Sequence, residues 1–93
     1  MDRFTVLYQL NNHYFYIGCS TYLLADLTLS NVQSVHSGEP LGIYDAKTEL
    51  FQWEPVRRHY YNKLSIEEQA RHDLRIIRIV HQLREEAVAA VLN

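Results

Sequence analysis

The chain has 93 residues, of which 47% are hydrophobic and 22% are charged, and its formal net charge is −2. A chain of this size has enough apolar surface for one hydrophobic core but not for two, so we expect a single domain over residues 1–93. The single cysteine excludes an internal disulfide framework and fits a reducing compartment, and no apolar run approaches the roughly 18 residues that a membrane-spanning helix needs. With no signal-peptide pattern at its start, the chain is predicted to be a cytoplasmic domain that does not enter a membrane.

Charge and structure-breaking residues divide the chain near residue 56. Residues 1–56 carry six acidic and two basic residues, whereas residues 57–93 carry five acidic and seven basic ones. All three glycines and both prolines lie in the first part. We therefore predict a β-rich part over residues 1–56, a connection over residues 57–64 and a C-terminal helix over residues 65–92.

Two β-hairpins are predicted in the first part. Residues 4–10 and 14–18 are rich in β-branched and aromatic residues, which suit a pleated surface. The asparagines that begin the connection at Asn11 tolerate the left-handed backbone of a tight turn. Residues 41–44 and 49–53 form the second pair of strands.

Two other segments of the first part are less regular. For residues 21–29 the sequence is compatible with either a helix or a strand. We favour a short helix or turn, because Ser20 can cap a helix, although Leu23 and Leu27 also suit a strand. Residues 38–42 are too acidic for a phosphate-binding loop and are predicted to be a turn that enters the second hairpin.

The last part predicts a long amphipathic helix. Ser65 and Glu68 match a capping box, and neither glycine nor proline follows before the end of the chain. Strands that precede a helix, rather than alternate with helices, predict an α+β fold. We expect a small antiparallel sheet of three to five strands, with the C-terminal helix or a pair of helices packed on one face.

The apolar stripe of this helix is predicted to bind a partner protein. A helix of roughly 27 residues is about 40 Å long, whereas strands of five to seven residues span roughly 20 Å, so the stripe exceeds what the sheet can cover. The residues assigned to this partner-binding face are Asp73, Leu74, Ile76, Ile77, Val80, Leu83, Arg84 and Ala87.

Asp73 and Arg84 are the two charges in the middle of this stripe. They are about 16 Å apart along the helix axis and do not reach each other within one straight helix. Reversal of the helix about the point between Arg78 and Ile79 exchanges the two positions, so two antiparallel copies would pair both charges in a homodimer. The alternative is that the helix packs on the chain's own sheet and that both charges reach polar groups at its rim.

Aromatic residues predict a second partner-binding face. Tyr14, Tyr16, Tyr44 and Trp53 provide more ring area than one sheet face needs, and exposed tyrosine and tryptophan often anchor protein interfaces. The alternative is a core with tyrosine hydroxyls at its rim. The two predicted faces together favour a small non-enzymatic interaction, adaptor or regulatory protein whose protein partner the sequence does not identify.

A basic region offers an alternative function. Cations and tyrosines alternate after residue 56, and such a pattern can follow a nucleic-acid backbone while its rings stack on bases. Nearby glutamates and the slightly acidic chain favour instead a solvated, salt-bridged helix face. The residues assigned to this nucleic-acid alternative are Arg57, Arg58, Lys63, Arg71, Arg75 and Arg78.

No group of residues predicts catalysis, a metal site or a cofactor. The five histidines lack metal-ligand spacing, and Cys19 has no adjacent base in the sequence. The string Tyr16-Ile17-Gly18 resembles the second signature of the GIY-YIG endonucleases. However, Gly42-Ile43-Tyr44 follows that string instead of preceding it, and no arginine follows where that family contacts the scissile phosphate. We therefore expect no enzyme activity.

Overall fold

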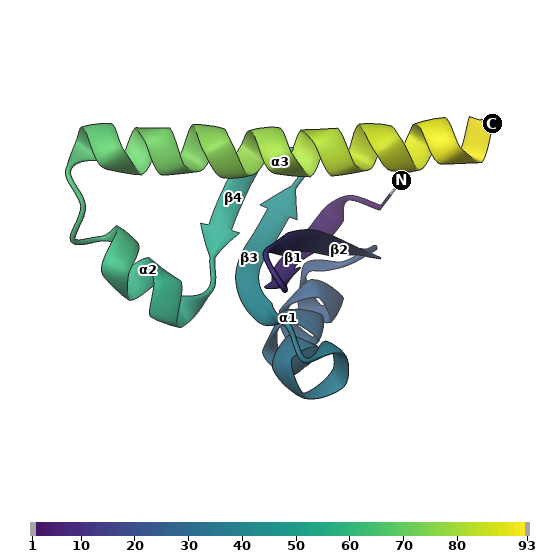
Figure 1. The fold of residues 1–93 in the computed structure, drawn as a ribbon, viewed down its shortest axis with the longest axis horizontal. Helices are drawn as coiled ribbons and strands as arrows, with labels where there is room; N and C mark the ends of the chain where they lie inside the picture. The colour runs from purple at the N-terminus through teal and green to yellow at the C-terminus, as the bar shows by residue number, and fades with distance from the viewer. Residues whose placement is uncertain (1, 93) are drawn as a thin grey trace.

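The structure is a computed structural model that describes residues 2–92, with side chains described for residues 2–90. The elements in chain order are β1 (Phe4–Leu10), β2 (His13–Cys19), α1 (Tyr22–His36), β3 (Glu39–Asp45), β4 (Leu50–Trp53), α2 (Pro55–Tyr61) and α3 (Ile66–Leu92). The four strands form one antiparallel sheet, with α1 on one face and α3 on the other (Figure 1). The predicted α+β class and the long C-terminal helix are confirmed.

Both predicted hairpins are present in a sheet of strand order β2-β1-β3-β4. The first turn places Asn11 and Asn12 at φ angles of 53° and 65°. Asparagine tolerates this left-handed backbone, and a two-residue turn of this kind matches the twist of the flanking strands. In the second hairpin, Glu49 takes the left-handed conformation, with a φ of 60°.

The central strand β1 contributes to two separate cores. Phe4, Val6 and Tyr8 lie in the cluster that faces α1, whereas Leu7 lies in the cluster that faces α3. Successive side chains of a strand point to opposite faces, so a strand that is buried on both sides reads as a nearly continuous apolar run. Only one polar side chain of β1, Thr5, is fully buried, and it is 1% exposed.

Residues 21–29 begin the helix α1, which was the favoured alternative for that segment. The cap is Thr21 rather than the predicted Ser20, because Thr21 Oγ1 accepts a hydrogen bond from the amide of Leu24 at 3.2 Å. Ala25, Leu29 and Val32, spaced by four and three residues, are buried against the sheet.

The turn predicted over residues 38–42 is wrong beyond its first residue, because β3 begins at Glu39. The pairing of β1 with β3 shifts register at this point, between Leu7 and Tyr8. Gly42 lies inside β3 because a Cβ there would collide with the backbone of Gln52 on β4 and lie 2.7 Å from the ring of Phe51. The glycine therefore permits a close approach of two strands.

The connection predicted over residues 57–64 is also wrong in part, because α2 occupies most of it. The carboxylate of Glu54 accepts hydrogen bonds from the amides of Val56 at 3.0 Å and Arg57 at 3.2 Å. Pro55 stands at the first helical position, where the missing N–H has no helical partner to lose. Glutamate is not a preferred cap, and a helix of seven residues is too short to display a clear apolar period.

The C-terminal helix α3 runs unbroken for 27 residues and extends past the strands at both ends (Figure 1). Ser65 Oγ accepts a hydrogen bond from the amide of Glu68 at 3.2 Å, which confirms the serine half of the predicted capping box. Towards the ends of the helix, Ile66 and Val88 are 85% and 44% exposed. The sheet therefore covers the middle of the helix and leaves its ends open.

Candidate functional site

The middle of α3 is a core face rather than the predicted partner-binding face. Ile76 and Val80 are 5% and 0% exposed and form one cluster with residues of β1 and β3. Ile77 and Leu83 pack half-buried against the same cluster. Of the eight residues assigned to this face, Leu74 alone is exposed, at 65%. The chain's own sheet already occupies the place that was predicted for a partner.

Asp73 has two hydrogen-bond partners within the chain. Its Oδ1 accepts from the indole N–H of Trp53 at 3.2 Å, and its Oδ2 accepts from the hydroxyl of Tyr61 at 2.6 Å. The rings of Trp53 and Tyr61 stack with their centroids 5.6 Å apart. Burial, followed by the hydrogen bond to Asp73 and its negative charge, raises the pKa of Tyr61 to about 12. One carboxylate thus joins β4, α2 and α3.

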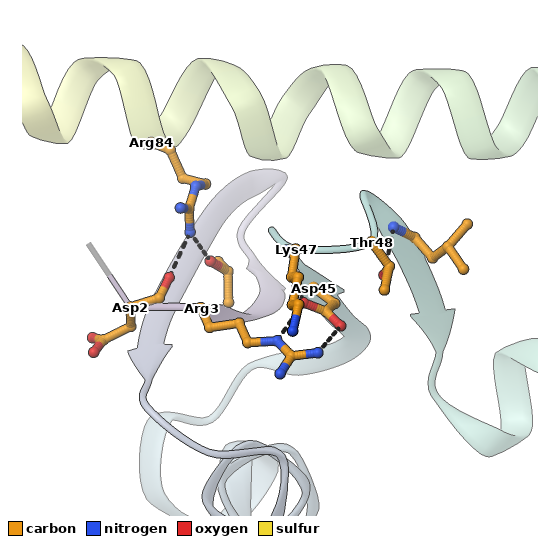
Figure 2. Close-up of polar contacts among 8 residues, drawn as sticks. Asp2, Arg3, Asp45, Lys47, Thr48 and Arg84 are labelled. Atoms are coloured by element: carbon orange, nitrogen blue, oxygen red, sulfur yellow. Dashed lines mark hydrogen bonds and ion pairs between the residues drawn. The ribbon is translucent and has the colours of Figure 1, made fainter.

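Arg84 also has partners within the chain. Its Nη1 donates to Thr5 Oγ1 at 2.8 Å and to the backbone oxygen of Asp2 at 3.1 Å (Figure 2). The first of these bonds satisfies a hydroxyl that is buried on the α3 side of β1. The structure therefore shows the second of the two alternatives for Asp73 and Arg84: both charges reach polar groups of the same chain. The charge pattern no longer favours an antiparallel dimer of α3.

An ion pair ties the residue before β1 to the end of β3. Arg3 donates through Nε and Nη2 to the two carboxylate oxygens of Asp45, at 2.8 and 2.9 Å (Figure 2). The amide of Lys47 donates to the same carboxylate at 2.9 Å. The hydrogen bonds from Arg3 are the main reason that the pKa of Asp45 lies well below its usual range. The two hydrogen bonds from Arg3 hold the N-terminal segment on the sheet.

The four residues of the predicted aromatic face lie beneath α3. Tyr44 is 2% exposed, and its hydroxyl oxygen is 2.8 Å from Nε2 of His81 on that helix. Tyr14, Tyr16 and Trp53 pack, partly buried, against the same cluster. Tyr44 is therefore a core residue and not part of a partner-binding face, whereas Tyr14, Tyr16 and Trp53 keep part of their surface exposed and their role in binding a partner stays a prediction. These rings fill the core between the sheet and α3, with their polar atoms at its edge, as the alternative had it.

Two of the predicted basic residues do come together. Two adjoining cavities, of about 180 and 270 Å³, share Trp53, Arg57 and His72 in their walls. Arg75 and Tyr14 line the smaller one. Arg57 donates to Glu39 at 3.0 Å, whereas Arg75 makes no ion pair within the part of the chain that the structure describes. The cavities thus combine aromatic rings with guanidinium groups.

Two of the remaining basic residues, Arg71 and Arg58, line neighbouring hollows. Arg71 lines a hollow next to Arg75 on α3, and Arg58 lines a different cavity, of about 340 Å³. Lys63 Nζ lies 5.7 Å from the centre of the Tyr60 ring. Arg78 is exposed and does not line the two cavities beside Trp53. Arg57, Arg58, Arg71 and Arg75 therefore line hollows that share Trp53 or His72 in their walls, whereas Lys63 and Arg78 line none of these hollows.

The outer side of α1 carries an exposed apolar surface that the sequence analysis did not assign. Leu23, Leu24, Leu27 and Val35 are 70%, 47%, 53% and 68% exposed. They lie away from the side of α1 that buries Ala25, Leu29 and Val32. Asp26 is the only acidic residue of α1, and the helix has no lysine or arginine. We call this surface the outer α1 face and define it as Leu23, Leu24, Leu27, Ser30, Asn31, Ser34 and Val35.

The polar side chains of the outer α1 face bond to their own helix. Ser30 Oγ donates to the backbone oxygen of Asp26 at 3.0 Å, and Asn31 Nδ2 donates to that of Leu27 at 2.8 Å. Ser34 Oγ donates to the backbone oxygen of Asn31 at 3.1 Å. Because each of these donors already has an acceptor, covering the face with an apolar surface strands few hydrogen-bonding groups.

The sequence contains a signal for this face, but the signal depends on knowing the helix. At about 100° per residue, Leu23, Leu27, Ser30 and Ser34 fall within a sector of about 60°, opposite the core positions. While residues 21–29 are open between helix and strand, this arrangement cannot be recognised.

Cys19 is buried, and its thiol donates to Thr28 Oγ1 at 3.7 Å. Within the described residues, no three histidine, cysteine, aspartate or glutamate side chains converge as metal ligands. Among the helices described here, none combines the length and apolarity that crossing a lipid bilayer requires.

Comparison with protein-family models, curated proteins and solved structures finds no match to this chain. What the chain does is therefore inferred from its own residues.

Proposed function

We propose that the protein is a small non-enzymatic interaction module that docks on an apolar protein surface through the outer α1 face. The exposure of Leu23, Leu24 and Leu27 on a helix with a single charged side chain, Asp26, carries this proposal. Contiguous exposed apolar patches of this kind mark interaction sites in proteins. A protein-interaction role was expected for α3, and it is reassigned to α1 because the sheet covers the middle of α3.

Burial of the exposed leucines by a partner would favour association. Full burial of a leucine side chain contributes about 1.5–3 kcal/mol relative to exposure. Leu23 and Leu27 each expose more than half of their surface, and Leu24 nearly half. A partner that covers all three therefore gains a few kcal/mol from apolar burial alone, and this gain depends little on salt.

Capture from an extract of the native cell tests the proposal. The wild-type chain should retain a partner at high salt, and Leu23→Asp combined with Leu27→Asp should reduce that retention at least tenfold, because the partner would have to bury two carboxylates. Leu74→Asp is the matched control, since Leu74 is equally exposed but lies on α3. Retention that survives the double substitution, or that disappears on adding salt, contradicts docking through the outer α1 face.

A second candidate function is binding of single-stranded nucleic acid in the two cavities beside Trp53. The proximity of Arg57, Arg75 and His72 to aromatic rings favours it. Guanidinium groups bind phosphates, and aromatic side chains stack on bases. The net charge of −2 and the ion pair of Arg57 with Glu39 weigh against it, so it ranks second.

Fluorescence anisotropy with a labelled single-stranded oligonucleotide tests this second candidate. Binding should weaken steeply between about 50 and 200 mM salt, and Arg75→Glu should reduce the affinity by tenfold or more. Arg78→Glu makes the same charge change on the same helix outside the cavities, so it should have the smaller effect. Equal effects of the two substitutions would indicate non-specific attraction and reject the site.

A further inference from the structure

We infer that the partner of the outer α1 face is a second copy of this chain, with the two α1 helices packed antiparallel about a twofold axis. This inference rests on the proposed function and names its partner. Three properties of the face support it: the sizes of its side chains, the arrangement of its few polar groups and its position in the fold.

The side chains of the outer α1 face are complementary in size to the same face reversed. The middle of the face is a ridge of four residues that lie within one sector of the helix. The ridge has large residues, Leu23 and Leu27, in the first half of α1 and small residues, Ser30 and Ser34, in the second half. Reversal about the point between Thr28 and Leu29 sets Leu23 opposite Ser34 and Leu27 opposite Ser30. Small residues opposite large ones let two helices approach closely and fill the space between them.

The residues on either side of the ridge also meet compatible residues of the second copy in this antiparallel register. On one side, Leu24 of one copy lies within about one helical turn of Val35 of the other, so two apolar pairs form across the axis. On the other side, Asp26 of one copy lies within about one helical turn of Gln33 of the other, whose amide can donate to its carboxylate. The hydroxyls of the two serines and one N–H of Asn31 already donate to their own helix, so few hydrogen-bonding groups lose water in the interface.

The position of α1 leaves this face open to a second molecule. The helix lies on the side of the sheet opposite α3, at the outside of the molecule (Figure 1). A helix of 15 residues is about 22 Å long. An interface made of two such helices lies at the low end of areas for specific complexes, so we expect dissociation in the micromolar range.

Sedimentation equilibrium on the full chain, over roughly 1 to 100 µM, tests the inference. The wild type should change from monomer to dimer over this range. Leu27→Ser removes a large residue, and Ser30→Leu places a second large residue opposite it; each should raise the dissociation constant at least tenfold. The double variant, Leu27→Ser with Ser30→Leu, restores one large residue against one small residue and should recover most of the affinity. Circular dichroism checks that each variant keeps its helices.

The substitution Ser30→Leu separates specific pairing from general adhesion. It makes the face more apolar, so non-specific association would strengthen, whereas size-matched pairing weakens. A chain that stays monomeric throughout the range overturns the second copy as the partner. The inference is also overturned if the wild-type chain co-sediments with phosphatidylcholine vesicles and the Leu23→Asp, Leu27→Asp variant does not, because the partner of the face would then be a lipid surface.

The failure of this inference and that of the proposed function have different signatures. A monomeric chain that still captures another protein through the outer α1 face retains the interaction role with a different partner. A monomeric chain whose captures are unaffected by Leu23→Asp with Leu27→Asp loses both.

Discussion

Tyr61 on α2 donates its hydroxyl hydrogen to Asp73 on α3 at 2.6 Å, and this bond fixes how the two helices meet. The same carboxylate accepts from Trp53 at the end of β4. Gln69 adds a second link between the helices, since its side-chain amide donates to the backbone oxygen of Tyr61 at 3.1 Å. A half-buried charge on the face of α3 is thereby satisfied inside the chain, which lets α3 pack on the sheet without a partner molecule.

Removal of the Tyr61 hydroxyl should destabilise the fold. Tyr61→Phe keeps the stacked ring but deprives Asp73 of its shorter hydrogen bond, so we expect the free energy of unfolding to fall by about 1–2 kcal/mol. Urea denaturation measures this change. Tyr60→Phe is the control, because Tyr60 is 64% exposed, and it should change the free energy by less than about 0.5 kcal/mol. Equal stability of the two variants would show that the bond to Asp73 contributes nothing.

The same tyrosine should make the protein sensitive to alkali. Its pKa is about 12 in the folded chain, above the value of about 10 in an unfolded chain. Its contribution to stability is therefore complete below about pH 10 and is lost as the pH rises towards 12. Burial also raises the pKa of Tyr44, so the wild type loses stability through both residues. Tyr61→Phe should lose it less steeply in urea titrations above about pH 10, and an unchanged slope would contradict this assignment.

The elements that sequence predicted well depend on short-range chemistry. Asn11 and Asn12 mark the first turn because asparagine tolerates positive φ, and Ser65 marks the start of α3 because its hydroxyl caps the next turn. α2 was missed because its cap, Glu54, is an unusual one and because seven residues display no period. Such boundaries are visible only where the local signal is strong.

The candidate sites were harder to predict because they depend on contacts distant in sequence. The stripe of α3 was recognised, but Arg84 reaches Thr5, which lies 79 residues earlier in the chain, and periodicity contains no information about that contact. The outer α1 face required knowing both that residues 22–36 are helical and that Ala25 faces the sheet. Exposure of Leu23 follows only from the packed fold.

The ion pair between Arg3 and Asp45 should make stability depend on acid. The pKa of Asp45 is lowered in the folded chain, mainly by Arg3, so its contribution is present above the unfolded value of about 4 and is lost as the pH falls below it. Asp45→Asn removes the titrating group, and the variant should lose less stability than the wild type between about pH 4 and pH 2. Thermal unfolding followed by circular dichroism measures the difference. Parallel curves for the two chains would exclude Asp45 as a source of acid sensitivity.

One side of α3 packs on the sheet and the other is exposed, which predicts effects of very different size for two neighbouring apolar residues. Ile76 is 5% exposed and belongs to the cluster with Leu7 and Tyr44, so Ile76→Ala should reduce the free energy of unfolding by about 2–5 kcal/mol, through lost burial and a cavity that the sheet cannot close. Leu74 is 65% exposed, and Leu74→Ala should change it by less than about 0.5 kcal/mol, since alanine favours the helix and little burial is lost. Urea denaturation at low protein concentration measures both values on the monomer. If Leu74→Ala proved as costly as Ile76→Ala in the monomer, Leu74 would be packed within the chain, which contradicts its exposed position on α3.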